Sequence, residues 1–289
     1  MADHSKLVTP IQNEHYEGER PLAFSRDLLI MHTAIGPGSG ALLECEHIEA
    51  HQCTFDGRRT FWHNHGSNIS HSSFSAQAGE GVWYAEGIDF RRNQVEAPCF
   101  FRHSSELRIE DCAFTQAAET LWMCSAIRIR DCSFAGADHL FMHSGGIEGR
   151  KLEISGRQCL QYIRDSELHD CTISGEGALW GCQNVKIYDS VLHGGGLGWH
   201  SSKLHLISCT IHGRQPLCHA RNLIIEDCRF GPDCELAFEY SSVIANIDGT
   251  LPSVINPQQG LISAQGYGQI IVDEHDRSSG KCMIKISGV

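Results

Sequence analysis

Side chains able to hydrogen-bond or to transfer protons recur along this chain at intervals of about twenty residues. Each follows a large residue, often tryptophan, in short segments such as Phe61-Trp62-His63-Asn64. The members of this His/Tyr column are His63, Tyr84, His103, His143, Tyr162, His200, His219 and Glu239. Imidazole, phenol and carboxylate groups are donors and acceptors for hydroxyl-rich ligands. If the fold aligns them, the sequence predicts an outward stripe that binds a carbohydrate or another extended ligand.

A second set of residues lies two positions beyond the column and would share its face, because side chains alternate along a strand. Its members are His65, Glu86, Ser105, Arg164 and Arg221. His63, His65, Glu86 and His103 are the candidates for general acid and base catalysis. His63 and His65 are also a weak candidate metal pair, since catalytic zinc takes three protein ligands and His103 or Glu86 would have to complete the set. A simpler interpretation is a solvated face whose polar residues merely stack. No cofactor is predicted.

Aspartates and cysteines form two further repeating sets. Asp111 with Asp131, and Asp170 with Asp189, could bracket a calcium ion or act as an acid/base pair. Turn chemistry explains them more simply, because Asp hydrogen-bonds its own backbone and tolerates turn conformations. Six of the 14 cysteines occupy one apolar position of the repeat, two residues before its last apolar residue, and no Cys-x-x-Cys occurs. We therefore predict reduced, core-packing thiols.

The element that must position these residues is one repeated phrase, clearest at Leu107–Phe114 and again at Ile127–Phe134. Its last apolar residue serves as an anchor, and successive anchors are 19 to 21 residues apart. The anchors are Ile35, Phe55, Phe74, Val95, Phe114, Phe134, Ile154, Ile173, Leu192, Ile211 and Phe230. Alternation with period two indicates strands, and a repeat near twenty residues indicates a solenoid.

We therefore predict an all-β, right-handed parallel β-helix of about eleven coils, with three short strands per coil. Residues 1–25 would form an N-terminal cap, 26–249 the β-helix and 250–289 a C-terminal β cap, within one continuous domain. In the third strand of each coil, the tryptophans (Trp62, Trp83, Trp122, Trp180 and Trp199) are predicted to face inward and the His/Tyr column outward. The reason is that a carboxylate such as Glu239 would be costly inside the core.

Composition excludes several classes of partner. The chain has 289 residues, is 41% hydrophobic and carries a net charge of -12. No run of Lys or Arg interrupts this acidic balance, so we expect no nucleic-acid partner. No stretch approaches the roughly 18 apolar residues of a membrane span, and the N-terminus lacks the pattern of a signal peptide. A cytoplasmic location without membrane attachment is expected.

Several local motifs together resemble a known family. They are Gly18-Glu19-Arg20, the Phe-Trp-His-Asn-His-Gly segment at 61–66, the Asp-Cys coils, Pro216-Leu217-Cys218, Leu236-Ala237-Phe238-Glu239, and Asn256-Pro257 followed by Gln269-Ile270-Ile271. On these motifs the chain is similar to uncharacterised bacterial proteins of domain-of-unknown-function family 3737. The resemblance implies a pectin-lyase-like β-helix with no established activity. A "hydrogenase" label attached to some relatives has no support here, because no Cys-x-x-Cys pair is available for metal ligation.

Three functions stay open, because a fold does not determine a function. The first is a module that binds a carbohydrate or similar extended ligand along the His/Tyr column. The second is a polysaccharide lyase or glycoside hydrolase. The carboxylate, calcium and basic-residue motifs of pectin-lyase-like enzymes do not transfer onto this chain. The third is a structural protein that assembles with further copies as a homo-oligomer.

Overall fold

The computed structural model describes residues 10–273 and 281–287, and in these ranges the chain is built of β-strands and turns without an α-helix. The chain divides into two compact units, an N-terminal unit (Met1–Ser133) and a C-terminal unit (Phe134–Val289). Each unit is a parallel β-solenoid, and together they contain about 14 turns. The predicted fold class is confirmed, although about eleven coils were expected. No helix of the described residues is long and apolar enough to span a membrane.

The N-terminal unit contains short strands joined by turns. They are β1 (Ile11–Gln12), β2 (His15–Glu19), β3 (Arg26–Met31), β4 (Ala34–Ser39), β5 (Glu46–His51), β6 (Thr54–Arg58), β7 (Asn68–Ser70), β8 (Ser73–Phe74), β9 (Val82–Trp83), β10 (Glu86–Arg91), β11 (Gln94–Val95), β12 (Phe101–Arg102), β13 (Ser105–Glu110) and β14 (Ala113–Phe114). Strand β15 (Ser125–Ala135) begins in this unit and ends in the next.

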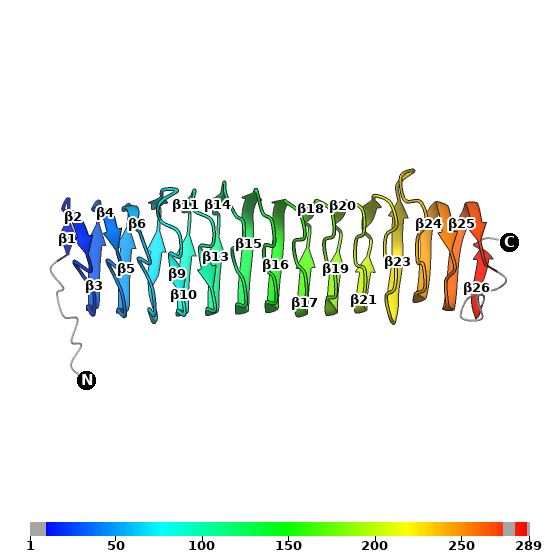
Figure 1. Cartoon of the computed structure of the whole chain (residues 1–289), viewed down its shortest axis with the longest axis horizontal. Helices are drawn as coiled ribbons and strands as arrows, with labels where there is room; N and C mark the ends of the chain where they lie inside the picture. The colour runs from blue at the N-terminus through cyan, green and yellow to red at the C-terminus, as the bar shows by residue number, and fades with distance from the viewer. Residues whose placement is uncertain (1–9, 274–280, 288–289) are drawn as a thin grey trace, which may run out of the picture. The chain divides into compact units, whose positions relative to one another are not determined.

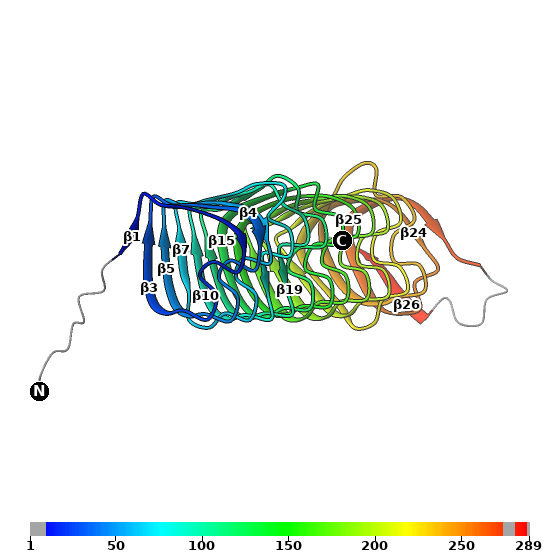
Figure 2. The ribbon, with the colours of Figure 1, turned by 60° about the vertical axis from the view of Figure 1, so that its left-hand side comes forward.

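Strands on one face of the N-terminal unit pair in parallel in the order β1, β3, β5, β7, β10, β13, and Figures 1 and 2 show them side by side. A second face pairs β2, β4, β6, β8, β11 and β14. Because each coil bonds to the coils before and after it, equivalent residues stack into columns along the unit.

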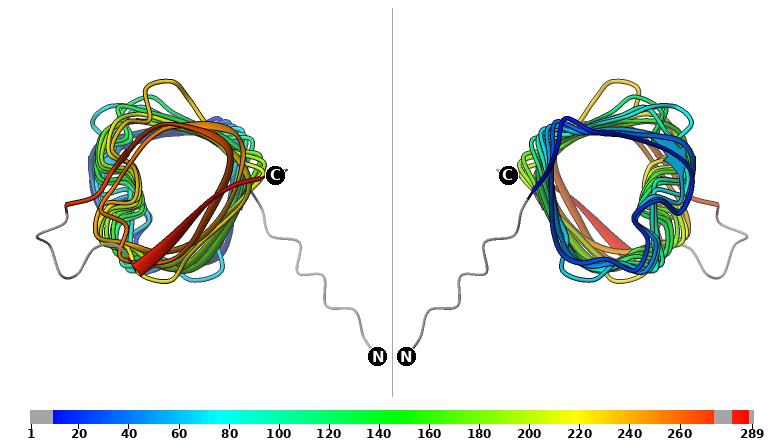
Figure 3. Two further views of the ribbon diagram at one scale, coloured as in Figure 1. Left: turned by 90° about the vertical axis from the view of Figure 1, so that its right-hand side faces the viewer. Right: turned by 90° about the vertical axis from the view of Figure 1, so that its left-hand side faces the viewer.

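The C-terminal unit repeats this plan. Its strands are β16 (Gly145–Ser155), β17 (Arg164–His169), β18 (Thr172–Ser174), β19 (Gln183–Tyr188), β20 (Val191–His193), β21 (Ser202–Ile207), β22 (Thr210–His212), β23 (Leu223–Phe230), β24 (Ser242–Ile255), β25 (Gln259–Ile271) and β26 (Lys281–Ile286). Parallel pairing runs from β16 through β17, β19, β21, β23, β24 and β25 to β26. In the end-on views the backbone of this unit winds in successive closed loops (Figure 3).

The anchors occupy the predicted place in both units. Phe55 pairs with Phe74 and Ile173 with Leu192, and every anchor side chain is buried. The thiols are free and mostly buried among them. Asp111 and Asp170 adopt the left-handed turn conformation, with φ of 52° and 54°. This conformation supports the turn interpretation of the aspartates.

Two local predictions were wrong. The coils extend beyond the predicted anchors, since Tyr16 pairs with Ile35 at one end and β24 to β26 continue the parallel pairing at the other. The third segment of each coil is mostly a turn rather than a strand. Only β9 and β12 pair there as strands among the described residues.

Candidate binding site

The His/Tyr column faces solvent because of an unusual backbone conformation. His63, Tyr84 and His103 have φ between 51° and 56°, and His143, Tyr162, His200 and His219 between 54° and 58°. Non-glycine residues rarely adopt this left-handed region. At most of them the strand alternation is interrupted, so a half-buried side chain and an exposed one follow each other before the next one is buried. Before Tyr162 and His219, the preceding Gln161 and Cys218 are buried.

The prediction that the tryptophans face inward was therefore wrong. Trp62 is half-buried beside the exposed His63, and the next residue, Asn64, is buried. The other tryptophans are likewise half-buried on the outside. Arg102 occupies the equivalent place between two of them, with its guanidinium 5.1 Å from the Trp83 ring centre and 4.7 Å from that of Trp122.

In the N-terminal unit the column forms a stack of parallel rings. The centres of His63 and Tyr84 are 5.1 Å apart, and those of Tyr84 and His103 are 5.0 Å apart. The backbone enforces this spacing, since the His63 and Tyr84 N–H groups each donate to a carbonyl of the next coil. Rings stacked face to face leave their edges exposed to solvent.

The catalytic candidates His63, His65, Glu86 and His103 do not converge on one point. Tyr84 lies between His63 and His103 in the stack. His65 and Glu86 pair on the adjacent column, with Nδ1 and Oε2 3.7 Å apart and both side chains about half exposed. The described residues contain no group of three or more His, Cys, Asp or Glu able to hold a metal ion.

In the C-terminal unit the stack has two parts. His143 and Tyr162 lie 4.8 Å apart. Gly181 occupies the next place, and a Cβ atom there would lie 2.7 Å from the Tyr162 ring. The second part contains His200 and His219, whose ring centres are 5.0 Å apart, followed by Tyr240 at 5.4 Å.

Glu239 was assigned to the wrong column. The His219 N–H donates to the Glu239 carbonyl, just as the His63 N–H donates to the Trp83 carbonyl. Glu239 therefore belongs to the column of the tryptophans. Tyr240 occupies the His/Tyr column, with φ of 51°. The column advances by 21 residues between His219 and Tyr240 instead of the preceding 19. The buried Ser241 could have signalled the correct register of this column. Its hydroxyl accepts a hydrogen bond from the Ala220 N–H, just as the Ser104 hydroxyl accepts one from the Ala85 N–H.

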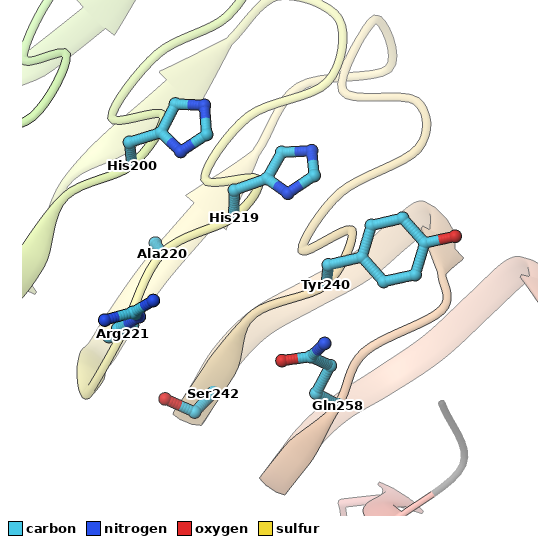
Figure 4. Close-up of a pocket in the computed structure, with 7 residues that line it drawn as sticks. All are labelled: His200, His219, Ala220, Arg221, Tyr240, Ser242 and Gln258. Atoms are coloured by element: carbon cyan, nitrogen blue, oxygen red, sulfur yellow. The ribbon is translucent and has the colours of Figure 1, made fainter. Parts of the chain in front are cut away.

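A groove of about 380 Å³ lies beside the second stack, and its lining residues are His200, His219, Ala220, Arg221, Tyr240, Ser242 and Gln258. In Figure 4 the His200, His219 and Tyr240 rings project to the same side from successive coils, above Arg221 and Ser242. Partial burial lowers the pKa of His200, and the neighbouring His219 lowers that pKa further. His200 is therefore suited to act as a neutral hydrogen-bonding group.

The column that flanks the groove differs in charge between the two units. In the C-terminal unit this flanking column reads Arg164, Gln183, Ser202, Arg221, Ser242 and Gln259. Neither Arg164 nor Arg221 forms an ion pair with any described residue. The corresponding column of the N-terminal unit contains Arg26, Glu46, His65, Glu86 and Ser105, and its arginine is paired with Glu46. The arginines of this column that pair with no carboxylate thus lie in the C-terminal unit.

No curated protein matches the chain. Among solved structures, HetL, a pentapeptide repeat protein involved in heterocyst differentiation regulation from the cyanobacterium Nostoc sp. strain PCC 7120, is 11% identical with a TM-score of 0.35, over 67% of this chain and 84% of HetL. The catalytic domain of a GH87 α-1,3-glucanase in complex with tetrasaccharides is 10% identical with a TM-score of 0.23, over 97% of this chain and 62% of that one. A family model described as protein of unknown function (DUF3737) matches residues 9–285, and the chain therefore belongs to the DUF3737 family.

Proposed function

We propose that the C-terminal unit binds an extended, hydroxyl-rich and anionic chain, such as an acidic oligosaccharide, along the His/Tyr column. The observation that carries the proposal is the line of ring edges at His200, His219 and Tyr240, set beside a flanking column with arginines and no carboxylate.

Ring stacking determines the kind of contact that the column can offer. His200 and His219 cover each other's faces, so a sugar ring cannot stack on them as on an isolated aromatic. Their edges instead place a nitrogen or hydroxyl group at every coil, about 5 Å from the next. Regularly spaced donors and acceptors suit a ligand whose own hydroxyl groups repeat along an extended chain.

Charge supports an anionic ligand rather than a neutral one. Arg164 and Arg221 project from the flanking column on the same face, and guanidinium groups bind carboxylates through paired hydrogen bonds. The N-terminal unit offers a similar ring stack, but Glu46 and Glu86 beside it would repel an anion.

Calorimetric titration with two oligosaccharides of equal length, one a uronic-acid oligomer and one a neutral glucose oligomer, tests the proposal. We expect the acidic oligomer to bind, and Arg221→Gln and His219→Ala each to weaken that binding by about tenfold, since a lost charged hydrogen bond costs about 1.5–3 kcal/mol. His103→Ala, the matched ring deletion in the N-terminal unit, should leave the affinity unchanged. Failure of both oligomers to bind, or an equal loss in His103→Ala, would contradict the proposal.

The same mixtures separate binding from catalysis. After prolonged incubation we expect no increase in reducing ends and no unsaturated product, because His63, His65, Glu86 and His103 do not converge on a single reacting atom. New reducing ends that disappear in His65→Ala would favour a hydrolase or lyase instead.

A further inference from the structure

A second hollow lies on another face of the N-terminal unit, at the ends of strands β7, β10 and β13. It has a volume of about 340 Å³, and its lining residues are Asn68, Ser70, His71, Arg91, Arg92, Glu110, Asp111 and Arg130. Parallel pairing aligns Ser70, Arg91, Glu110 and Arg130 in one outward column. His71, Arg92 and Asp111 follow them at the turn and form the next column.

Most of the charges around this hollow are already paired. The Glu110 carboxylate accepts hydrogen bonds from Arg108 Nε at 2.7 Å and from Arg130 Nη2 at 2.9 Å, and its side chain is only 9% exposed. The Arg91 guanidinium donates to Asp89 through Nη2. These contacts occupy the Glu110 carboxylate and one oxygen of Asp89.

Arg92 is the cation whose hydrogen-bonding capacity is least satisfied. Its nearest carboxylate oxygen, Asp111 Oδ2, is 3.6 Å from Nε, which is longer than a hydrogen bond. Its Nη1 is 3.4 Å from His71 Nε2, a neutral acceptor at best. The side chain is 63% exposed. The buried Nε of the neighbouring Arg91 has no hydrogen-bond partner.

Arginines are concentrated around this hollow in a chain with a net charge of -12. Four of them (Arg91, Arg92, Arg108 and Arg130) lie among the carboxylates of Asp89, Glu110, Asp111 and Asp131. Asn68, Ser70 and His71 add polar groups to the lining. The volume is near the lower end of the range for small-molecule sites, about 300–1,000 Å³.

We propose that this hollow binds the phosphate group of a small molecule, with Arg92 and Arg91 as its principal ligands. A planar guanidinium offers paired donors that match a phosphate, which a lysine does not. An oxyanion between Arg92 and the wall formed by Asn68, Ser70 and His71 would replace the long contact to Asp111 with charged hydrogen bonds. The site lies in the N-terminal unit and is independent of the oligosaccharide site proposed above.

Titration calorimetry of the full chain at constant ionic strength tests this site, with inorganic phosphate and glycerol 3-phosphate as separate probes. We expect saturable binding, with Arg92→Gln at least tenfold weaker and Arg92→Lys intermediate. Tighter binding of the ester than of free phosphate would assign the site to a phosphorylated metabolite, and the reverse order would assign it to the free ion. The circular dichroism and melting temperature of each variant check that the fold is retained.

Two controls separate a built site from general attraction. Arg26→Gln removes the same charge from an exposed Arg26–Glu46 pair in the same unit, and Arg157→Gln removes it from an exposed Arg157–Asp138 pair in the C-terminal unit. Neither should change the affinity for phosphate. The proposal is overturned if the unsubstituted chain binds neither probe at millimolar concentration, or if either control loses as much affinity as Arg92→Gln.

Discussion

The orientation of single residues in this protein depends on backbone conformation more than on side-chain polarity. Histidine, tyrosine and glutamate occupy left-handed positions such as His63 and Glu44, a region that costs non-glycine residues about 1 kcal/mol or more. Cross-coil hydrogen bonds at these positions and ring stacking offset that cost. The consequence is an exposed column whose side chains are held at a fixed spacing, as a binding surface requires.

Glu110 shows how a buried charge acts on stability. Hydrogen bonds from Arg130 and Arg108 lower the pKa of its carboxyl group from 4.5 to about 2. A carboxyl whose folded pKa is depressed adds stability above its unfolded pKa, and that stability is lost as the pH falls toward the folded value. We expect Glu110→Gln to lower the free energy of unfolding by about 1–3 kcal/mol at pH 7, because it leaves the arginines without their acceptor.

Urea denaturation between pH 7 and pH 2 measures this effect. The difference between the unsubstituted chain and Glu110→Gln should shrink as the pH falls below about 4.5 and disappear near pH 2. The exposed Glu106→Gln on the same strand is the control and should change stability little at any pH. A difference that stays constant down to pH 2 would show that packing, rather than charge, makes Glu110 important.

At the scale of elements, the closest approach between coils occurs at a column of glycines in the C-terminal unit. A Cβ atom on Gly194 would lie 2.0 Å from the Gly175 carbonyl oxygen, and the φ of Gly194 is 141°. We expect Gly194→Ala to destabilise the unit by at least about 2 kcal/mol, since the backbones would have to separate. Gly196→Ala is the matched control, because its φ is 67° but its nearest neighbour is 3.8 Å away. Thermal unfolding should show a much smaller loss for this variant, about 1 kcal/mol, and equal losses would rule out the steric explanation.

The elements also determine how much of this structure could be predicted from the sequence. Anchors such as Phe55 and Phe74 have a fixed spacing and a uniform apolar character, so their stacking followed from the repeat. The orientation of Trp62 did not, because the prediction continued the strand alternation through His63, and histidine signals a positive φ only weakly. Glycine favours that conformation more strongly, and in this column it occurs at Gly181. Tyr240 was missed for a different reason. The coil between His219 and Tyr240 is longer than the preceding one, so the predicted column was out of register at this point.

The charge of the candidate binding surface could be predicted only in part. The repeat predicts that Arg221 shares a face with His219, and both residues line the same groove. The hollow around Arg92 was not foreseen, since its residues come from three columns and four coils and carry opposite charges that look balanced in sequence. Only the distances to Asp111 and His71 reveal that one arginine is incompletely paired.

At the scale of the whole molecule, stability should be distributed locally rather than shared equally by all coils. In a solenoid each repeat contacts its neighbours only, so its stability is a sum of repeat and interface terms. In the N-terminal unit, Phe74 illustrates such an interface, with ring centres 4.6 Å from Phe55 in the preceding coil and 4.8 Å from Phe100 in the following one. A perturbation at this residue should therefore be felt most by the coils that it joins.

Phe74→Ala tests this expectation through amide hydrogen exchange followed by mass spectrometry. Removal of a buried phenyl ring costs about 3–5 kcal/mol, and we expect faster exchange in β6, β8 and β11, whose backbones pair around residue 74. Peptides from β18, β20 and β22 of the C-terminal unit should keep their exchange rates. Phe24→Ala, at a side chain that is 61% exposed in the same unit, is the control and should change little. Equal acceleration in both units would mean that the chain opens as one cooperative structure, and the nearest-neighbour description would then have to be abandoned.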